Sequence, residues 1–283
     1  MTAAAAGLGG GRETALTEVF RQAAQPLLIP YMVGGYPDRE GCLEILRAYV
    51  RAGAGLVELG IPFSDPLADG PVIQAASQVA LRQGIRPLDV LELAGQVSTE
   101  GVPVVLLSYL NTVLAFGPGR FFSRCHDAGV LGVVIPDLPA EEAKELQDLA
   151  HNHGVDVVLL AAPTSTDARL ARIAQAASGF IYCVSTTGVT GPRAALRADL
   201  PAFLGRLRRY THLPLAVGFG VSTPEQAAAV AQHAEGVIIG SVLVDMVTKS
   251  PNLTAALERV ERFLREAQQS MRAAAVGKPL EET

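Results

Sequence analysis

The hexapeptide D-V-V-L-L-A, Asp156–Ala161, is almost wholly apolar and precedes a longer helical pattern at Asp167–Ala177. A second run of the same kind, V-P-V-V-L-L at Val102–Leu107, lies earlier in the chain. Continuous apolar runs are typical of strands that are buried on both faces, as in a parallel sheet covered by helices. The two stretches therefore predict a strand followed by a helix as the repeating unit of the fold.

The same strand–helix unit is repeated along the chain, both before and after these two stretches. Strands are expected at Leu27–Val33, Gly55–Gly60, Val102–Leu107, Gly132–Ile135, Asp156–Ala161, Phe180–Val184, Leu215–Gly218 and Gly236–Ile239. Helices are expected between and after them at Glu40–Ala52, Pro87–Ser98, Gly119–Ala128, Ala140–His153, Asp167–Ala177, Leu200–Arg209, Pro224–His233 and Leu253–Arg272. One extra helix, Leu16–Ala24, is expected before the first strand.

Eight strand–helix repeats predict an α/β fold, a single (β/α)8 TIM barrel with an extra N-terminal helix. The alternative, a doubly wound open sheet, would need a nucleotide-binding fingerprint after its first strand. The segment G-G-Y-P at residues 34–37 does not match G-x-G-x-x-G, and its proline suits a turn instead.

The composition suits one large domain. The chain has 283 residues, 49% of them apolar, and we expect a barrel over residues 13–272 between flexible tails at 1–12 and 273–283. The net charge is −5 without a basic patch, which argues against a nucleic-acid partner. The three cysteines lie far apart with no C-x-x-C pair, which favours a cytoplasmic location. Neither a signal peptide nor an apolar run of about 20 residues is present, so no membrane association is expected.

The second strand and the loop after it carry three acids in V-E-L-G-I-P-F-S-D-P-L-A-D-G-P, residues 57–71. Strand alternation places Glu58 on the face that points into the barrel, near the rim. A buried glutamate without a cation has a raised pKa and can exchange protons near neutral pH. A structural glutamate paired with arginine is the alternative, but no predicted strand contains an arginine. Asp65 and Asp69 fall in the loop above Glu58, where Asp-Pro and Asp-Gly are also ordinary turn sequences.

Three glycine clusters follow the last three strands. They are T-G-V-T-G at 187–191, G-F-G at 218–220 and G-S at 240–241, where a further helix begins. Glycines let main-chain N–H groups approach an anion, and a helix N-terminus adds its dipole. The loops after strands seven and eight hold phosphate in many barrels of this architecture, so a phosphate ester is the expected ligand.

Other catalytic groups are scarce at the strand ends. The lysines Lys144, Lys249 and Lys278 all fall outside them, which disfavours a Schiff-base mechanism. The histidines lie in helices or before a strand, so no metal site is expected. The residues thus favour acid–base cleavage or isomerisation of a small phosphate ester.

From Leu27 to about Met246 the chain resembles the tryptophan synthase α subunit family. The most specific match is L-V-E-L-G-I-P-F-S-D-P-L-A-D-G-P at 56–71. Further matches are P-Y-M-V-G-G-Y-P-D at 30–38, L-L-S-Y-L-N at 106–111, P-D-L-P at 136–139, S-T-T-G-V-T-G at 185–191, G-F-G-V-S-T-P-E-Q at 218–226 and G-V-I-I-G-S at 236–241.

The resemblance implies a carbon–carbon lyase that cleaves indole-3-glycerol phosphate into indole and glyceraldehyde 3-phosphate by a retro-aldol reaction, as a step of tryptophan biosynthesis. It assigns Glu58 as the general acid–base residue and Asp69 as the second catalytic carboxylate, with no metal or cofactor. The phosphate would be bound by Gly188, Gly191, Gly218, Gly220, Gly240 and Ser241. The indole pocket would comprise Tyr31, Ile73, Leu107, Tyr109 and Tyr182.

The resemblance also implies a partner. The family's α subunit pairs with a β subunit that carries pyridoxal phosphate and receives indole, in an α2β2 tetramer. Contacts would come from Pro62–Phe63, Asp65 and Leu110–Thr112. The alternatives are a free-standing indole-3-glycerol-phosphate lyase, a barrel that only binds, and another phosphate-binding isomerase. The two carboxylates argue against a mere binding role, and the D-P-L-A-D-G loop argues against the isomerase.

Overall fold

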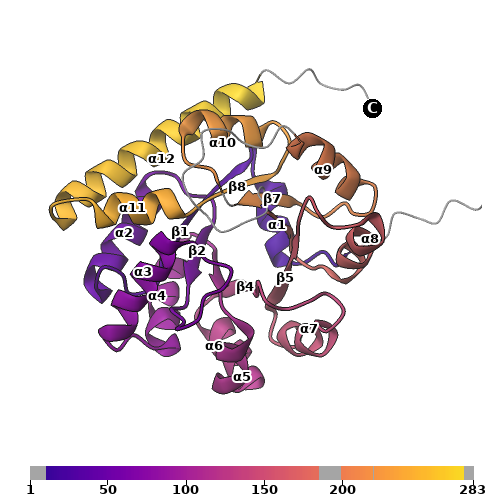
Figure 1. Ribbon diagram of the computed structural model, residues 1–283, viewed down its shortest axis with the longest axis horizontal. Helices are drawn as coiled ribbons and strands as arrows, with labels where there is room; N and C mark the ends of the chain where they lie inside the picture. The colour runs from indigo at the N-terminus through magenta and orange to yellow at the C-terminus, as the bar shows by residue number, and fades with distance from the viewer. Residues whose placement is uncertain (1–10, 185–198, 219, 277–283) are drawn as a thin grey trace, which may run out of the picture.

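A computed structural model describes residues 11–184, 199–218 and 220–276. Its strands form a closed parallel barrel in the order of the sequence, from β1 to β8, and β8 pairs with β1. Figure 1 shows the helices surrounding this ring of strands, so the predicted (β/α)8 barrel is confirmed. The strands are β1 (Leu27–Val33), β2 (Val57–Gly60), β3 (Val104–Leu107), β4 (Val130–Val134), β5 (Asp156–Ala161), β6 (Ile181–Val184), β7 (Leu215–Gly218) and β8 (Gly236–Ile239).

The described helices cover the barrel and cap its lower end. They are α1 (Ala15–Gln22), α2 (Arg39–Arg51), α3 (Pro71–Arg82), α4 (Pro87–Thr99), α5 (Leu110–Phe116), α6 (Pro118–Asp127), α7 (Lys144–His151), α8 (Asp167–Ala176), α9 (Leu200–Arg208), α10 (Pro224–Ala231), α11 (Ser241–Thr248) and α12 (Leu253–Val276). Each helix expected from the sequence is present, with small shifts at the ends. The helix expected from Ala140 begins four residues late, because a turn closed by the Glu142 N–H and the Pro139 carbonyl comes first.

Two further helices, α3 and α5, were not predicted. In α3 the apolar residues Val72, Ile73 and Ala76 follow Pro71 at helical spacing, and proline is favoured in the first turn. The helix matters because it begins at Pro71, close after Asp69, so the loop that carries Asp69 is anchored by β2 at one end and by α3 at the other.

The pairing of β1, β2 and β3 places side chains at one level of the barrel. Tyr31 pairs with Glu58, and Glu58 pairs with Val105. Residues that pair across neighbouring strands point to the same side of a sheet. Glu58 therefore shares the barrel interior with Tyr31, as strand alternation predicted.

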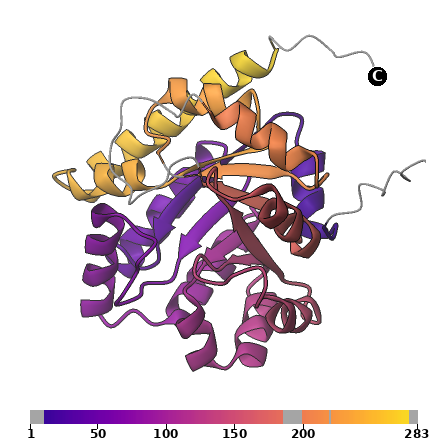
Figure 2. The ribbon, with the colours of Figure 1, turned by 45° about the vertical axis from the view of Figure 1, so that its right-hand side comes forward.

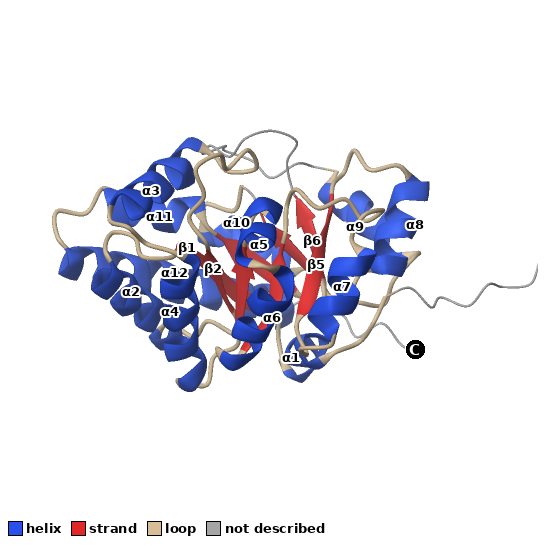
Figure 3. Cartoon of the chain, turned by 90° about the horizontal axis from the view of Figure 1, so that it is seen from below, coloured by secondary structure: helices blue, strands red, loops and turns tan. Residues whose placement is uncertain are grey.

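The N-terminal helix α1 lies across the amino-terminal ends of the strands (Figure 3). Its side chain Leu16 is fully buried and leaves no room for a Cβ at Gly132 or Gly179. Thr14 caps the helix and donates its hydroxyl to buried Asp156 over 2.5 Å. The predicted extra helix thus closes one end of the barrel.

Regular structure is found at both predicted tail boundaries. Arg12, assigned to the first tail, forms a parallel bridge with Ser178 and donates its N–H to the Ala177 carbonyl. The last helix continues to Val276, because the alanines after Arg272 favour helix. This helix packs along α10 and α2 (Figure 2). Across the described ranges, no helix is both long and apolar enough to cross a membrane.

Candidate active site

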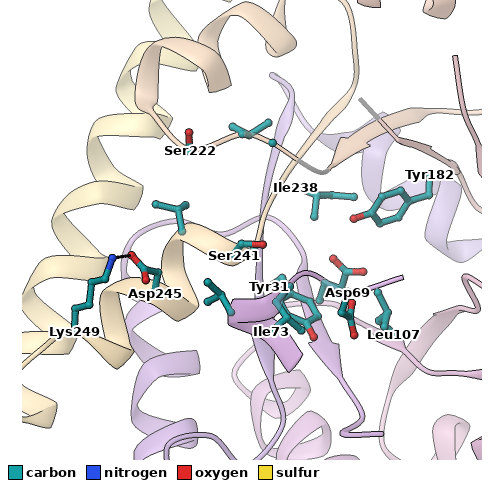
Figure 4. Close-up of a pocket in the computed structure, with 16 residues that line it drawn as sticks. Tyr31, Asp69, Ile73, Leu107, Tyr182, Ser222, Ile238, Ser241, Asp245 and Lys249 are labelled. Carbon is teal, nitrogen blue, oxygen red and sulfur yellow. Dashed lines mark hydrogen bonds and ion pairs between the residues drawn. The ribbon is translucent and has the colours of Figure 1, made fainter. Parts of the chain in front are cut away.

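A cavity of about 290 Å³ opens at the carboxyl ends of the strands (Figure 4). Side chains or main chain from six strands, or from the segments that follow them, form its wall. The lining residues are Tyr31, Glu58, Asp69, Val72, Ile73, Leu107, Tyr182, Gly220, Val221, Ser222, Ile238, Gly240, Ser241, Val242, Asp245 and Lys249. The cavity is therefore where this architecture normally places its chemistry.

Glu58 is the buried acid at the base of this cavity. Its side chain is 1% exposed, and no hydrogen-bond partner reaches its Oε1 atom within the part of the chain that the structure describes. Burial raises the pKa of Glu58 to about 8, and the nearby Asp69 carboxylate adds to this rise. A carboxyl group with this pKa holds a proton at neutral pH and can give it up. The orphaned oxygen, aimed at a cavity, leaves a position open for a ligand atom.

Asp69 is the second acid, held by the loop between β2 and α3. The Tyr109 hydroxyl donates to its carboxylate and also accepts the Ala68 N–H over 3.0 Å. The Tyr109 ring stacks on Phe63, with 5.1 Å between centroids. Burial raises the pKa of Asp69 to about 6, while the Tyr109 hydrogen bond opposes that rise. Asp69 is thus mostly ionised near pH 7, whereas Glu58 is mostly protonated.

Two tyrosines flank the acids from opposite sides of the barrel. Tyr31 lies over Gly60, and Tyr182 lies over Gly218. A Cβ at either glycine would stand 2.3 Å from the tyrosine oxygen, so both positions require glycine. Gly218 was predicted to bind phosphate, but it does not line the cavity and instead makes room for Tyr182.

The far side of the cavity suits an anion. It is lined by Ser222 and by three of the predicted phosphate ligands, Gly220, Gly240 and Ser241. Ser241 begins α11, whose N-cap Gly240 provides no side-chain hydrogen bond and whose first turn contains no acid. The free N–H groups of a helix N-terminus attract negative charge. The predicted phosphate ligands Gly188 and Gly191 lie outside the described residues.

The predicted indole pocket is largely assembled. Tyr31, Ile73, Leu107 and Tyr182 all line the cavity, and Ile238 joins them. Tyr109 does not line it, because its hydroxyl is engaged behind Asp69. Apolar walls at one end and an anion site at the other suit a flat ring that carries a phosphate tail.

Sequence reasoning gave no role to several lining residues, including Val72, Ser222, Asp245 and Lys249. Lys249 follows the last strand by ten residues, but α11 leads back along the cavity and brings the side chain to its rim. A helix is predicted to begin at 240–241, and the four-residue spacing of Ser241, Asp245 and Lys249 would place all three on one face of that helix. Over the described ranges, no three potential ligands from His, Cys, Asp and Glu come together to hold a metal.

A parallel barrel whose cavity contains two carboxyl groups and a helix N-terminus is typical of an acid–base enzyme that acts on a small anionic substrate. The comparisons with known proteins agree. A family model described as "Tryptophan synthase alpha chain" matches residues 18–275. The chain belongs to the tryptophan synthase alpha chain family.

Individual relatives show the same similarity. The tryptophan synthase alpha chain of Roseiflexus sp. (strain RS-1) is 47% identical over 82% of this chain and 89% of the relative. That of Dehalococcoides mccartyi (strain ATCC BAA-2100 / JCM 16839 / KCTC 5957 / BAV1) is 44% identical over 86% and 94%. A solved structure of Mycobacterium tuberculosis tryptophan synthase superposes with a TM-score of 0.86 at 36% identity, covering 92% of this chain and 99% of that one. The tryptophan synthase alpha chain reaction is the cleavage of indole-3-glycerol phosphate into indole and glyceraldehyde 3-phosphate, a lyase step of tryptophan biosynthesis.

Proposed function

We propose that Glu58 and Asp69 carry out this cleavage together, with Glu58 transferring the protons and Asp69 controlling the indole nitrogen. The observation that carries the proposal is the buried, partly unpartnered Glu58 carboxyl group beside an ionised Asp69 in one cavity. The different pKa values of the two acids suit one proton donor and one carboxylate acceptor.

The chemistry then divides into two proton transfers around one bond cleavage. Protonated Glu58 gives its proton to C3 of the indole, which makes the ring an electron sink, while Asp69 accepts a hydrogen bond from the ring N–H as positive charge develops there. Glu58, now a carboxylate, takes the proton of the glycerol hydroxyl next to the ring. The electron pair of the breaking C–C bond returns to the ring, so that neutral indole and an aldehyde result.

The substrate would lie across the cavity in one orientation. The ring fits between Tyr31, Leu107 and Tyr182, and the phosphate points to the α11 N-terminus and Gly220. Gly188, Gly191 and Gly218 are also assigned to the phosphate by family resemblance. Gly188 and Gly191 lie outside the described residues, and Gly218 faces Tyr182 and does not line the cavity.

The dependence of the cleavage rate on pH tests this assignment. Indole release by the purified chain is expected to peak between about pH 6 and pH 8. Below about pH 6 Asp69 takes up a proton and can no longer stabilise the charged ring, because its pKa is raised to about 6. Above about pH 8 Glu58 loses the proton that it must donate, because its pKa is raised to about 8. The measurement is kcat/KM across this range, which reports the ionisations of the free enzyme, with the titration of the free substrate's phosphate determined separately and divided out.

A rate that stays constant from about pH 5 to pH 9 would contradict these roles. The absence of indole and glyceraldehyde 3-phosphate among the products would contradict the function itself. Glu58→Asp is the informative control, since it keeps a carboxyl group but withdraws it from the ring carbon.

We further propose a β subunit as partner, in an α2β2 tetramer, with pyridoxal phosphate bound only by that partner. Two large apolar side chains support an interface on the open end of the barrel: Leu67 is 87% exposed and Leu114 is 54% exposed. They lie after β2 and β3, next to the predicted contacts Asp65 and Asn111, which are also exposed. Pro62, predicted as a contact, is buried and offers little surface, and Phe63 is half-buried against Tyr109.

Mixing with a tryptophan synthase β chain from the same genome is expected to give co-elution at the tetramer mass and an increase in kcat. Leu67→Asp together with Leu114→Asp should abolish co-elution while leaving the rate of the isolated chain nearly unchanged, because neither residue lines the cavity. If the β chain neither co-elutes with this chain nor raises its kcat, the protein would instead be a free-standing lyase.

A further inference from the structure

The face of α11 that lines the cavity carries an acid and a base in addition to Ser241. Ser241, Asp245 and Lys249 follow one another at four-residue intervals, and all three line the cavity. The Lys249 ammonium group lies 2.8 Å from the Asp245 carboxylate. Figure 4 shows Ser241 between this pair and the Asp69 end of the cavity.

Asp245 creates an electrostatic problem for the phosphate proposed above. It lies only one helical turn beyond Ser241, a rise of about 6 Å. A phosphate ester at the helix N-terminus carries close to two negative charges, and a nearby carboxylate would repel it. Asp245 is only 32% exposed, so solvent screens its charge incompletely.

Lys249 supplies the compensating charge. Its side chain is 64% exposed and reaches back over one turn to Asp245. An exposed pair of this kind contributes little to stability, so stability gives no strong reason for it at this position. Because the Lys249–Asp245 pair lies on the cavity wall, an electrostatic effect on a bound ligand is the better reason for it.

We propose that Lys249 is a positioning residue for the substrate phosphate, which acts by cancelling the charge of Asp245 at the anion end of the cavity. This inference rests on the proposed function, because it presumes that the anion at the α11 N-terminus is the substrate phosphate. Lys249 sets how tightly the phosphate end is held and takes no part in the proton transfers. The effect is therefore expected in ligand affinity and KM, with kcat at saturation retained.

The test compares Lys249→Met, Asp245→Asn and the double variant in binding glycerol 3-phosphate, measured by calorimetry at low and high salt. Lys249→Met is expected to weaken binding about 3- to 10-fold at low ionic strength, with a smaller loss in high salt. Asp245→Asn should bind at least as tightly as the wild type. The double variant should recover most of the loss, because it removes the repulsion together with its compensation.

The chain contains a matched control. Lys144 and Asp148 on α7 form a lysine–aspartate pair at the same spacing but in the reverse order, 2.7 Å apart, and neither lines the cavity. Lys144→Met removes one positive charge from the molecule as Lys249→Met does, and should leave glycerol 3-phosphate binding unchanged. Indole, which is neutral, should bind all variants equally.

Two results would overturn the inference. In the first, Lys249→Met binds glycerol 3-phosphate as well as Lys144→Met does. In the second, the double variant stays as weak as Lys249→Met, which would mean that Lys249 contacts the phosphate itself. Failure of the proposed function would look different, since the wild type would then not cleave indole-3-glycerol phosphate.

Discussion

Glu58→Gln is expected to lower the cleavage rate by about 10³-fold or more while the fold and substrate binding are retained. The amide has nearly the shape of the acid but cannot donate and recover a proton, and a positioned general acid–base group contributes roughly 10²- to 10⁴-fold. Because Glu58 serves two proton transfers in the proposed mechanism, we expect the upper part of that range. Single-turnover measurement of indole release, with enzyme in excess, isolates the chemical step.

The stability of the same variant is an independent check on the buried acid. The folded-state pKa of Glu58 is about 8, well above its ordinary value of 4.5. The free energy of unfolding of the wild type therefore falls by roughly 1.4 kcal/mol per pH unit as the pH rises from about 4.5 to about 8. Position 58 of the Glu58→Gln variant has no titrating group and makes no such contribution. Relative to the wild type, the variant should thus gain up to about 3 kcal/mol between about pH 4.5 and pH 7. Denaturant unfolding at about pH 4.5 and pH 7 measures this difference.

A Glu58→Gln enzyme that cleaves within tenfold of the wild-type rate would show that another group moves the proton. A stability difference that does not change with pH would show that Glu58 is ionised in the folded protein. The two results address separate claims, one about catalysis and one about burial.

Asp69→Asn is expected to lower the rate by about 10²-fold, with a smaller change in substrate affinity. An amide can still lie beside the ring nitrogen, but it cannot balance positive charge that develops there. Removal of the Asp69 charge should also lower the pKa of Glu58, since that charge contributes to the rise. The measurements are kcat, KM and the alkaline limb of the residual rate, which should move to lower pH.

Tyr109→Phe is the matched variant for Asp69. It keeps the Asp69 carboxylate but removes its hydrogen bond and the support of the Ala68 N–H. The loss of this bond raises the pKa of Asp69, so the acid limb of the pH profile should move to higher pH with a loss of about tenfold in rate. If Asp69→Asn cleaved the substrate no more slowly than Tyr109→Phe, the negative charge of Asp69 would not be what the reaction requires.

The sequence was sufficient to predict the barrel and the position of Glu58. Strands buried on both faces are continuous apolar runs, and alternation within β2 determines which face Glu58 occupies. The anion site stays a prediction, based on glycine main chain and a helix N-terminus that suit a negative charge. Of its described glycines, Gly220 and Gly240 line the cavity and Gly218 does not.

Side-chain contacts between different strands and loops could not be predicted from the sequence. No local pattern shows that Tyr109, which follows β3, supports the Asp69 loop. Nor does one show that Tyr182 requires a glycine at position 218 on the neighbouring strand. Both contacts join residues of different strand–helix units, which the sequence alone does not bring together. Lys249 was set aside because it lies well beyond the last strand, and the sequence does not show that α11 runs along the cavity and returns Lys249 to its rim.

The helix α1, with Leu16 packed beneath Gly132 and Gly179, gives the barrel a solid floor. Within the described residues, the cavity thus opens at the carboxyl ends of the strands, and α1 closes the opposite end of the barrel. A neighbouring protein bound over the carboxyl ends would therefore stand beside the opening through which small molecules enter and leave the cavity.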